Sequence, residues 1–230
     1  MKELVAAFLL LALPAGAIEQ KDLAHISVEQ LVQDTQVQST EEDHLAIAWW
    51  IPYEYWETLF ARDENTTEKG REAILAALQK YTMVGVTQAD ISPLGAFDYY
   101  AEKEVAAATK LSFQKDEEEP IHLEPIEEID ANLRILLETI RPILARTMGD
   151  LGTHFYFLIL PRFDAENRLL LDPYGSGHLV IELGKRDAST VTSTIDLPLN
   201  ALFVPRLCPN GEEAHVTWNF CPWTGEKLPE

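Results

Sequence analysis

The sequence predicts an α+β fold with a central, mostly antiparallel sheet, helices packed on one face, and a small ribbon-like hairpin at the C-terminus. Helical periodicity dominates the first half of the body and strand-like runs dominate the second half, which is typical of α+β chains. The longest apolar run after the N-terminus covers residues 154–163 and is rich in aromatic and aliphatic side chains. Glycines and a turn bound this run, so we expect it to be a buried strand in the middle of the sheet.

We expect four segments along the chain. Residues 1–17 are predicted to be a signal peptide, residues 18–42 a polar segment with a short helix, residues 43–205 an α+β body, and residues 206–230 the ribbon-like hairpin. The 230 residues, 47% of them hydrophobic, suffice for one core with an appendage.

The net charge of −20 argues against two classes of partner. Nucleic acids and anionic membrane surfaces are both bound through Lys and Arg, which acidic residues outnumber here by 38 to 18. We therefore expect a protein or small-molecule partner, which the sequence does not identify, and nothing in the sequence indicates a cofactor.

The N-terminus has the pattern of a targeting segment. Lys2 precedes an apolar run, Leu4–Leu13, and Ala15 and Ala17 form an A-x-A cleavage site, so the mature chain would begin at Ile18. The alternative is an uncleaved anchor, although the run is too short to span a bilayer. We expect a secreted or periplasmic protein that is not stably inserted in a membrane after cleavage, and such compartments permit disulfides.

The first half of the body alternates short strands and helices. Ser27 and Gln30 form a capping box for a short helix, and residues 33–42 are polar enough for a connection. Residues 44–51 are an apolar strand ending before Pro52, which begins a helix. The aromatic side chains of residues 53–60 fall on one helical face and are interpreted as core; a ligand platform is the alternative.

The remaining elements follow from caps, breakers and periodicity. Thr67 caps a helix reaching Tyr81, and residues 83–87 form a short strand. We expect a helix over 97–109, a strand over 110–113, an acidic loop over 116–125 and a long helix from 126 to Gly149 that Pro142 kinks or divides. Further strands are expected over 168–172, 178–183, 190–195 and 202–204.

The most specific motif is at the C-terminal end. Cys208-Pro-Asn-Gly211 and Phe220-Cys-Pro-Trp-Thr-Gly-Glu-Lys-Leu228 resemble the two knuckles of a zinc ribbon. Each knuckle lacks its second cysteine, and Thr224 stands where the last ligand belongs, so the resemblance is to a degenerate ribbon without its zinc function. The resemblance implies that the knuckles face each other, which in an exported chain favours a Cys208–Cys221 disulfide. A metal held with His215, or free thiols, are the alternatives.

Two interpretations remain for the aromatic residues of this hairpin. Trp218, Phe220 and Trp223 are predicted to form its small core, with the first two in a strand over residues 216–220. The alternative is an exposed tryptophan pair that, with His215, binds a partner.

No catalytic motif identifies an active site. The sequence has no G-x-S-x-G, H-E-x-x-H or P-loop pattern. Asp172, Ser176 and His178 lie in a tight turn and are interpreted as a β-turn rather than a triad. Were the strands that begin at His44 and His154 to pair, the two imidazoles could share a metal. Residues 116–119 are interpreted as a solvated acidic loop, with calcium binding as the alternative.

These observations favour an exported, non-catalytic binding or interaction protein whose catalytic residues, if any, are unknown. Two alternatives stay open: a secreted hydrolase with a site assembled from distant residues, and a metal-binding protein using the degenerate ribbon.

Overall fold

The computed structural model describes residues 18–115 and 117–228 and divides into two compact units. The larger unit, the body, comprises residues 21–202. The smaller unit joins the N-terminal segment up to Gln20 to residues from Phe203 onward, and Gln20 bridges Phe203 within it. The predicted signal peptide, residues 1–17, lies outside the described residues.

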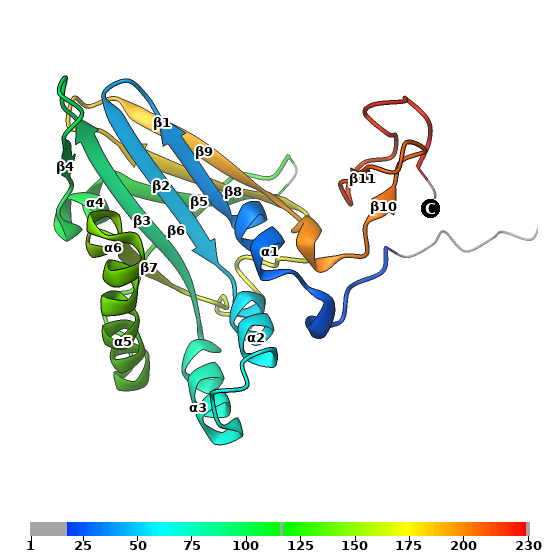
Figure 1. Cartoon of the computed structure of the whole chain (residues 1–230), viewed down its shortest axis with the longest axis horizontal. Helices are drawn as coiled ribbons and strands as arrows, with labels where there is room; N and C mark the ends of the chain where they lie inside the picture. The colour runs from blue at the N-terminus through cyan, green and yellow to red at the C-terminus, as the bar shows by residue number, and fades with distance from the viewer. Residues whose placement is uncertain (1–17, 116, 229–230) are drawn as a thin grey trace, which may run out of the picture. The chain divides into compact units, whose positions relative to one another are not determined.

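The first sheet of the body has five antiparallel strands (Figure 1). They are β1 (Gln36–Thr40), β2 (His44–Ile51), β3 (Tyr81–Ile91), β4 (Phe97–Tyr99) and β7 (Tyr156–Pro161). β3 is the centre, because it pairs with β2 along one edge and with β7 and β4 along the other. The prediction that residues 154–163 form the middle of the sheet is therefore wrong, since β7 pairs with β3 alone.

Two features of β3 explain why it supports neighbours on both edges. It is the longest strand, and residues 82–89 are buried although Thr82, Thr87 and Gln88 are polar. A side chain at Gly85 would overlap the ring of Phe155, so glycine lets this aromatic residue pack against the strand. Because these polar residues interrupt the apolar pattern, the sequence predicted only a short strand over residues 83–87 and not the central strand of the sheet.

The second sheet of the body has four strands in the order β6-β5-β8-β9, all antiparallel. These are β5 (Thr109–Gln114), β6 (Ile121–Leu123), β8 (Gly177–Gly184) and β9 (Thr190–Leu197). In Figure 1 this sheet lies behind the first, with β9 beside β1. The strand expected over residues 168–172 is reduced to a single bridge between Phe163 and Leu169.

Three helices pack together on one face of the first sheet. α2 (Tyr53–Ala61), α3 (Glu68–Leu78) and α5 (Ala131–Met148) share a core with strand residues Ile51, Met83 and Ile159. Trp56 and Phe60 of α2 are buried in it, as their helical spacing predicted. The α+β class, with a mostly antiparallel sheet and helices on one face, is confirmed.

The helix ends follow the local sequence signals. Ser27, Thr67 and Asp130 accept N–H groups at the starts of α1 (Val28–Thr35), α3 and α5. Pro142 does not divide α5, which continues to Met148. Short helices α4 (Glu102–Ala108), α6 (Asp150–Thr153) and two 3₁₀ turns, η1 (Leu23–His25) and η2 (Asn200–Leu202), complete the body.

From Lys21 onward, the N-terminal polar segment belongs to the body. Residues 33–42, expected to be a connection, are the end of α1 followed by β1, which pairs with β2 along its whole length. Trp49 of β2 donates its indole N–H to Thr35 at the end of α1, at 3.2 Å. The polar residues occur here because β1 is an edge strand.

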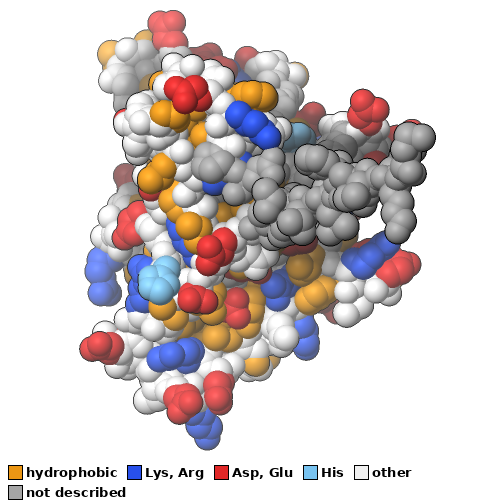
Figure 2. Space-filling model, turned by 90° about the vertical axis from the view of Figure 1, so that its right-hand side faces the viewer, with side chains coloured by type: hydrophobic (Ala, Val, Ile, Leu, Met, Phe, Trp, Pro, Cys, Tyr) orange, Lys and Arg blue, Asp and Glu red, His pale blue; other side chains and the backbone are white. Residues whose placement is uncertain are grey.

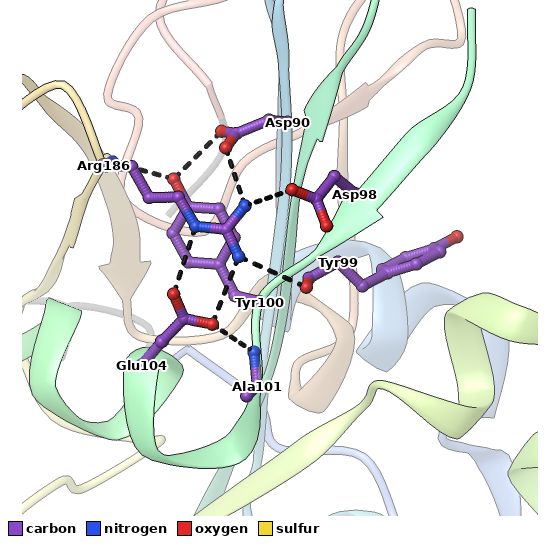
Figure 3. A network of polar contacts seen from close by, with 7 residues as sticks. All are labelled: Asp90, Asp98, Tyr99, Tyr100, Ala101, Glu104 and Arg186. Carbon is purple, nitrogen blue, oxygen red and sulfur yellow. Dashed lines mark hydrogen bonds and ion pairs between the residues drawn. The ribbon is translucent and has the colours of Figure 1, made fainter.

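One arginine joins the two sheets. Arg186, in the turn after β8, contacts three acidic residues from the first sheet and α4, namely Asp90, Asp98 and Glu104, at 2.8–3.1 Å (Figure 3). The Arg186 guanidinium also lies over the Tyr100 ring, 4.2 Å from the centroid. The backbone N–H of Arg186 donates to the Tyr100 hydroxyl. We call these five residues the Arg186 network.

Candidate functional site

The C-terminal tip, residues 203–228, contains two short hairpin turns that repeat one geometry. The first is closed by β10 (Arg206–Leu207) pairing with β11 (Glu213–Ala214), and the second by a bridge between Phe220 and Lys227. In each turn the glycine N–H, from Gly211 or Gly225, donates to the cysteine carbonyl, and the cysteine N–H donates to the carbonyl after the glycine; all four bonds are 2.8 Å. Both glycines have positive φ, 87° and 72°, which side chains disfavour.

The two turns are joined by the predicted disulfide between Cys208 and Cys221, whose Cα atoms are 5.6 Å apart. The disulfide is the centre of a very small core, completed by Ala214 and Leu228. The tip is too short to build an ordinary hydrophobic core. The disulfide-bonded cysteines occupy the interior position that larger apolar side chains fill in larger domains.

The aromatic residues of the tip lie on its surface. Trp218 is 41% exposed, Phe220 59% and Trp223 56%. The prediction that they form the core of the hairpin is therefore wrong, because the disulfide, Ala214 and Leu228 already fill the interior. The rings of Trp218 and Trp223 meet edge to face, with centroids 6.2 Å apart. We call these two residues the tryptophan pair.

The backbone beneath the tryptophan pair is held by hydrogen bonds. Arg206 donates from its guanidinium to the carbonyl oxygens of Val216, at 2.8 Å, and Trp218. The Trp218 N–H donates to the carbonyl oxygen of His215 at 3.0 Å. The strand expected over residues 216–220 is instead a turn, whose shape these bonds maintain.

His215 borders the tryptophan pair. Its ring centroid is 5.9 Å from that of Trp218, and its Nδ1 lies 2.8 Å from the Thr217 hydroxyl. Two residues of the predicted binding set, His215 and Trp218, therefore lie at one turn of the tip, and Trp223, in the turn between Cys221 and Gly225, meets them through its ring contact with Trp218. Within the described residues, no group of three or more His, Cys, Asp or Glu side chains is placed to bind a metal ion.

The tip is close to neutral although the whole chain is strongly acidic. Between residues 203 and 228, two basic side chains oppose three acidic ones, Glu212, Glu213 and Glu226. On the face that Figure 2 shows, hydrophobic side chains lie at the surface among acidic and basic ones. Within the tip, the tryptophan pair is therefore distinguished by its exposed aromatic surface and not by charge.

The structure separates the two histidines predicted to share a metal. β2 and β7 pair with opposite edges of β3 and not with each other. His44 is fully buried and packs edge-on against Tyr100, whereas His154 stacks on Tyr99. Since the strands do not pair, the proposed sharing of one metal loses its basis.

The turn at residues 172–178 forms as a turn. Asp172 accepts the N–H of Tyr174 at 3.0 Å through its side chain and the N–H of Gly175 at 3.0 Å through its carbonyl oxygen. His178 instead contacts Asp196 across the β8–β9 pair, at 2.8 Å. The triad geometry is absent from this turn, as the β-turn interpretation predicted. Of the acidic run 116–119, residue 116 lies outside the described residues and the others are exposed.

A buried ion pair escaped the sequence analysis. Glu54 of α2 and Arg162 after β7 are 3.2 Å apart, with side-chain exposures of 8% and 15%. Burial raises the pKa values of Glu54 and Glu57, and burial together with the nearby carboxylates raises the pKa of Tyr174 to about 12. Arg162 also lies over the Tyr53 ring at 4.2 Å. The partners are separated by 108 positions in the sequence, so the pair leaves no local signal.

A hollow elsewhere in the body does not contain this cluster. It has a volume of about 690 Å³ and lies beside the β5 end, with Lys115, Asp164, Arg168, Asp172 and Ser176 among its walls. Asp164 and Arg168 are 2.8 Å apart, and the bonds from Arg168 lower the pKa of Asp164. The carboxyl groups with raised pKa thus lie away from the hollow, whereas in its walls Asp164 is ion-paired and Asp172 accepts a backbone N–H.

No family model, curated protein or solved structure matches the chain. Over the residues that the structure describes, no helix is long and apolar enough to cross a membrane.

Proposed function

We propose that the protein is an exported, non-catalytic binding protein that contacts a protein partner through the tryptophan pair. The observation that carries this proposal is the exposure of Trp218 and Trp223, at 41% and 56%, on a tip closed by a disulfide. Tryptophan is enriched among the residues that supply most of the energy of protein interfaces. The exposed part of a large ring contributes no hydrophobic free energy to its own fold, whereas a partner that covers it gains the hydrophobic free energy of its burial.

The rigidity of the tip supports the same function. The disulfide, the two glycine turns and the bonds from Arg206 fix the backbone that carries the pair. A preorganised surface loses less conformational entropy when it binds, so more of the contact energy appears as affinity. The low net charge of the tip allows a partner to approach it without a strongly basic surface of its own.

Export and the ancestry of the tip belong to the same proposal. A disulfide is stable in oxidising compartments, which agrees with the N-terminal pattern. We infer that the tip derives from a zinc ribbon in which the disulfide replaced the metal, and the matching turns around Cys208 and Cys221 support this. Zinc bound through free Cys208 and Cys221 thiolates, seen by native mass spectrometry of the exported protein, would contradict it.

Site-specific photo-crosslinking tests the function. A photoreactive amino acid replaces Trp223 in one strain and Leu94 in another, the latter being 97% exposed in a loop of the body. We expect one discrete protein adduct at position 223, and its yield should fall in the Trp218→Ala variant. The same adduct should not form from position 94. The purified partner should then bind the Trp218→Ala variant about thirtyfold more weakly, as for a hot-spot residue. Equal adducts at both positions, or unchanged affinity, would overturn the proposal.

A further inference from the structure

Helix α5 exposes an apolar stripe on the side that faces away from the core. Ile135 is 62% exposed and Ile143 54%, with the exposed Thr139 midway between them. A spacing of four residues places all three on one helical face. Leu133 and Leu137, on the opposite face, are the buried residues of the helix, so the fold of the body does not require apolar residues at 135 and 143.

A groove runs beside this stripe. α3 and α5 lie next to each other, and a groove of about 510 Å³ between them is lined by Ala73, Ala76 and Ala77 of α3 and by Ile135 and Thr139 of α5. Alanines on the α3 wall allow a further helix to approach closely, because little side chain separates the backbones. Grooves of this kind accept the apolar face of an amphipathic helix.

The charges around the stripe identify the helix that fits. Exposed Glu127 and Glu128 precede α5, while Arg146 lies in its last turn. If a second α5 lies antiparallel on the first, the basic end of each helix meets the acidic end of the other. The two helix dipoles are then antiparallel, which is the favourable arrangement. The apolar residues match in the same arrangement: with Thr139 on the two-fold axis, Ile135 faces Ile143 of the partner subunit.

The local charge also permits two acidic chains to meet here. α3 contains two acidic and two basic residues, and α5 contains one acidic residue, Glu138, and three basic ones. The two helices are thus neutral to basic within a chain of net charge −20. Repulsion between two copies is weakest where these helices face each other.

We propose that the protein forms a symmetric homodimer through antiparallel contact of α5 with α5 of a second copy, centred on Thr139 and flanked by the α3 groove. The interface is isologous, since both subunits use the same surface. Its argument uses no residue of the C-terminal tip, so this proposal stands independently of the proposed function.

Cysteine cross-linking tests the arrangement, because the described residues contain no free cysteine. Thr139→Cys places two thiols beside the two-fold axis, where helices in contact bring Cα atoms within disulfide reach. Lys110→Cys, at an exposed position on β5, is the matched control. On mild oxidation we expect about tenfold more covalent dimer from the first variant than from the second. Equal yields would overturn the proposal.

A mixed experiment tests the antiparallel register. An equimolar mixture of Ile135→Cys and Ile143→Cys chains, distinguished by a mass tag, should give mainly the mixed dimer. Mainly like-with-like dimers would mean parallel helices and would overturn the proposal.

Sedimentation of the intact protein tests the dimer without substitution. The wild-type chain should dimerise, and Ile135→Arg should raise the dissociation constant about thirtyfold while leaving the circular dichroism melt unchanged. A wild-type chain that stays monomeric at its highest soluble concentration, or a dimer that persists in the variant, would overturn the assignment.

Discussion

The Arg186 network and the C-terminal tip both bring aromatic rings together with charged side chains, but they treat the rings in opposite ways. Tyr100 is 2% exposed, with the Arg186 guanidinium over its ring and its hydroxyl bonded to Asp90. Trp223 is 56% exposed. The first ring is a structural part of the junction between two sheets, and the second is available to another molecule.

Unit size explains the difference. The body can cover an aromatic residue with two sheets and a layer of helices. The tip has fewer than thirty described residues, and the core around its disulfide is completed by only Ala214 and Leu228. A chain this short has too little material to enclose three large rings, so a disulfide supplies the stability that a core would otherwise give.

Removal of the disulfide should have the largest effect and should be confined to the tip. The bond closes a separation of 13 residues, so the double variant Cys208→Ser, Cys221→Ser should lose about 3 kcal/mol of local stability. Native-state hydrogen exchange measures it through the Gly211 and Gly225 amides, which bond to the cysteine carbonyls. Exchange from β3 is the internal control. Unchanged protection of the two glycine amides would show that the turns hold without the disulfide.

Loss of the arginine should have the next largest effect, this time in the body. Arg186→Met removes the cation shared by three carboxylates, and the free energy of unfolding should fall by about 1–2 kcal/mol, because partial exposure lets solvent screen the remaining charges. Urea denaturation measures the change. Arg186→Lys is the matched control: it keeps the charge but loses the planar fork, so it should recover only part of the stability. Full recovery with lysine would mean that charge alone matters.

Acidification should weaken the body through His44, beside the same junction. Burial, followed by the nearby Lys185, lowers the pKa of His44, while Asp90 and Glu41 oppose this. The unfolded chain therefore binds this proton more readily than the folded one, so the contribution of neutral His44 is complete above pH 6.5 and is lost as the pH falls below it.

The measurement compares unfolding free energies at pH 7 and pH 5.5 for the wild type and His44→Gln. We expect a smaller loss in the variant, because it has no imidazole to protonate. His25→Gln, at an exposed site, controls for removal of a histidine as such. An equal loss in His44→Gln and the wild type would assign the acid sensitivity to other groups.

Local signals predicted much of this structure, and long-range pairing accounts for the rest. The caps at Ser27 and Thr67 and the aromatic face of α2 depend on residues within one or two turns, and all three were correct. The central position of β3 was missed, because Thr82, Thr87 and Gln88 interrupt its apolar pattern and only its partners on both edges reveal its place. The edge strand β1 was also missed, because its polar residues are equally typical of a loop.

The candidate site divides in the same way. The ribbon-like knuckles implied the Cys208–Cys221 disulfide correctly, but they did not show where the rings point, which depends on how little space the finished core leaves. The Arg186 network had no sequence signal, since its acidic members lie 82 to 96 residues from the arginine. The Glu54–Arg162 pair was undetectable for the same reason.

The smallest effect on stability should come from the tryptophan pair itself, and this most sharply separates the two regions. Trp223→Ala should change the free energy of unfolding by less than about 0.5 kcal/mol, because the ring is mostly in water already. Tyr100→Phe, which deletes a single hydroxyl, should cost about 1 kcal/mol, because that oxygen bonds both Arg186 and Asp90. Urea denaturation of both variants and the tip amide exchange of Trp223→Ala provide the comparison. If removing the whole indole ring destabilised the tip more than removing one oxygen destabilised the body, Trp223 would be part of the tip's fold, and its exposure would no longer argue for a partner.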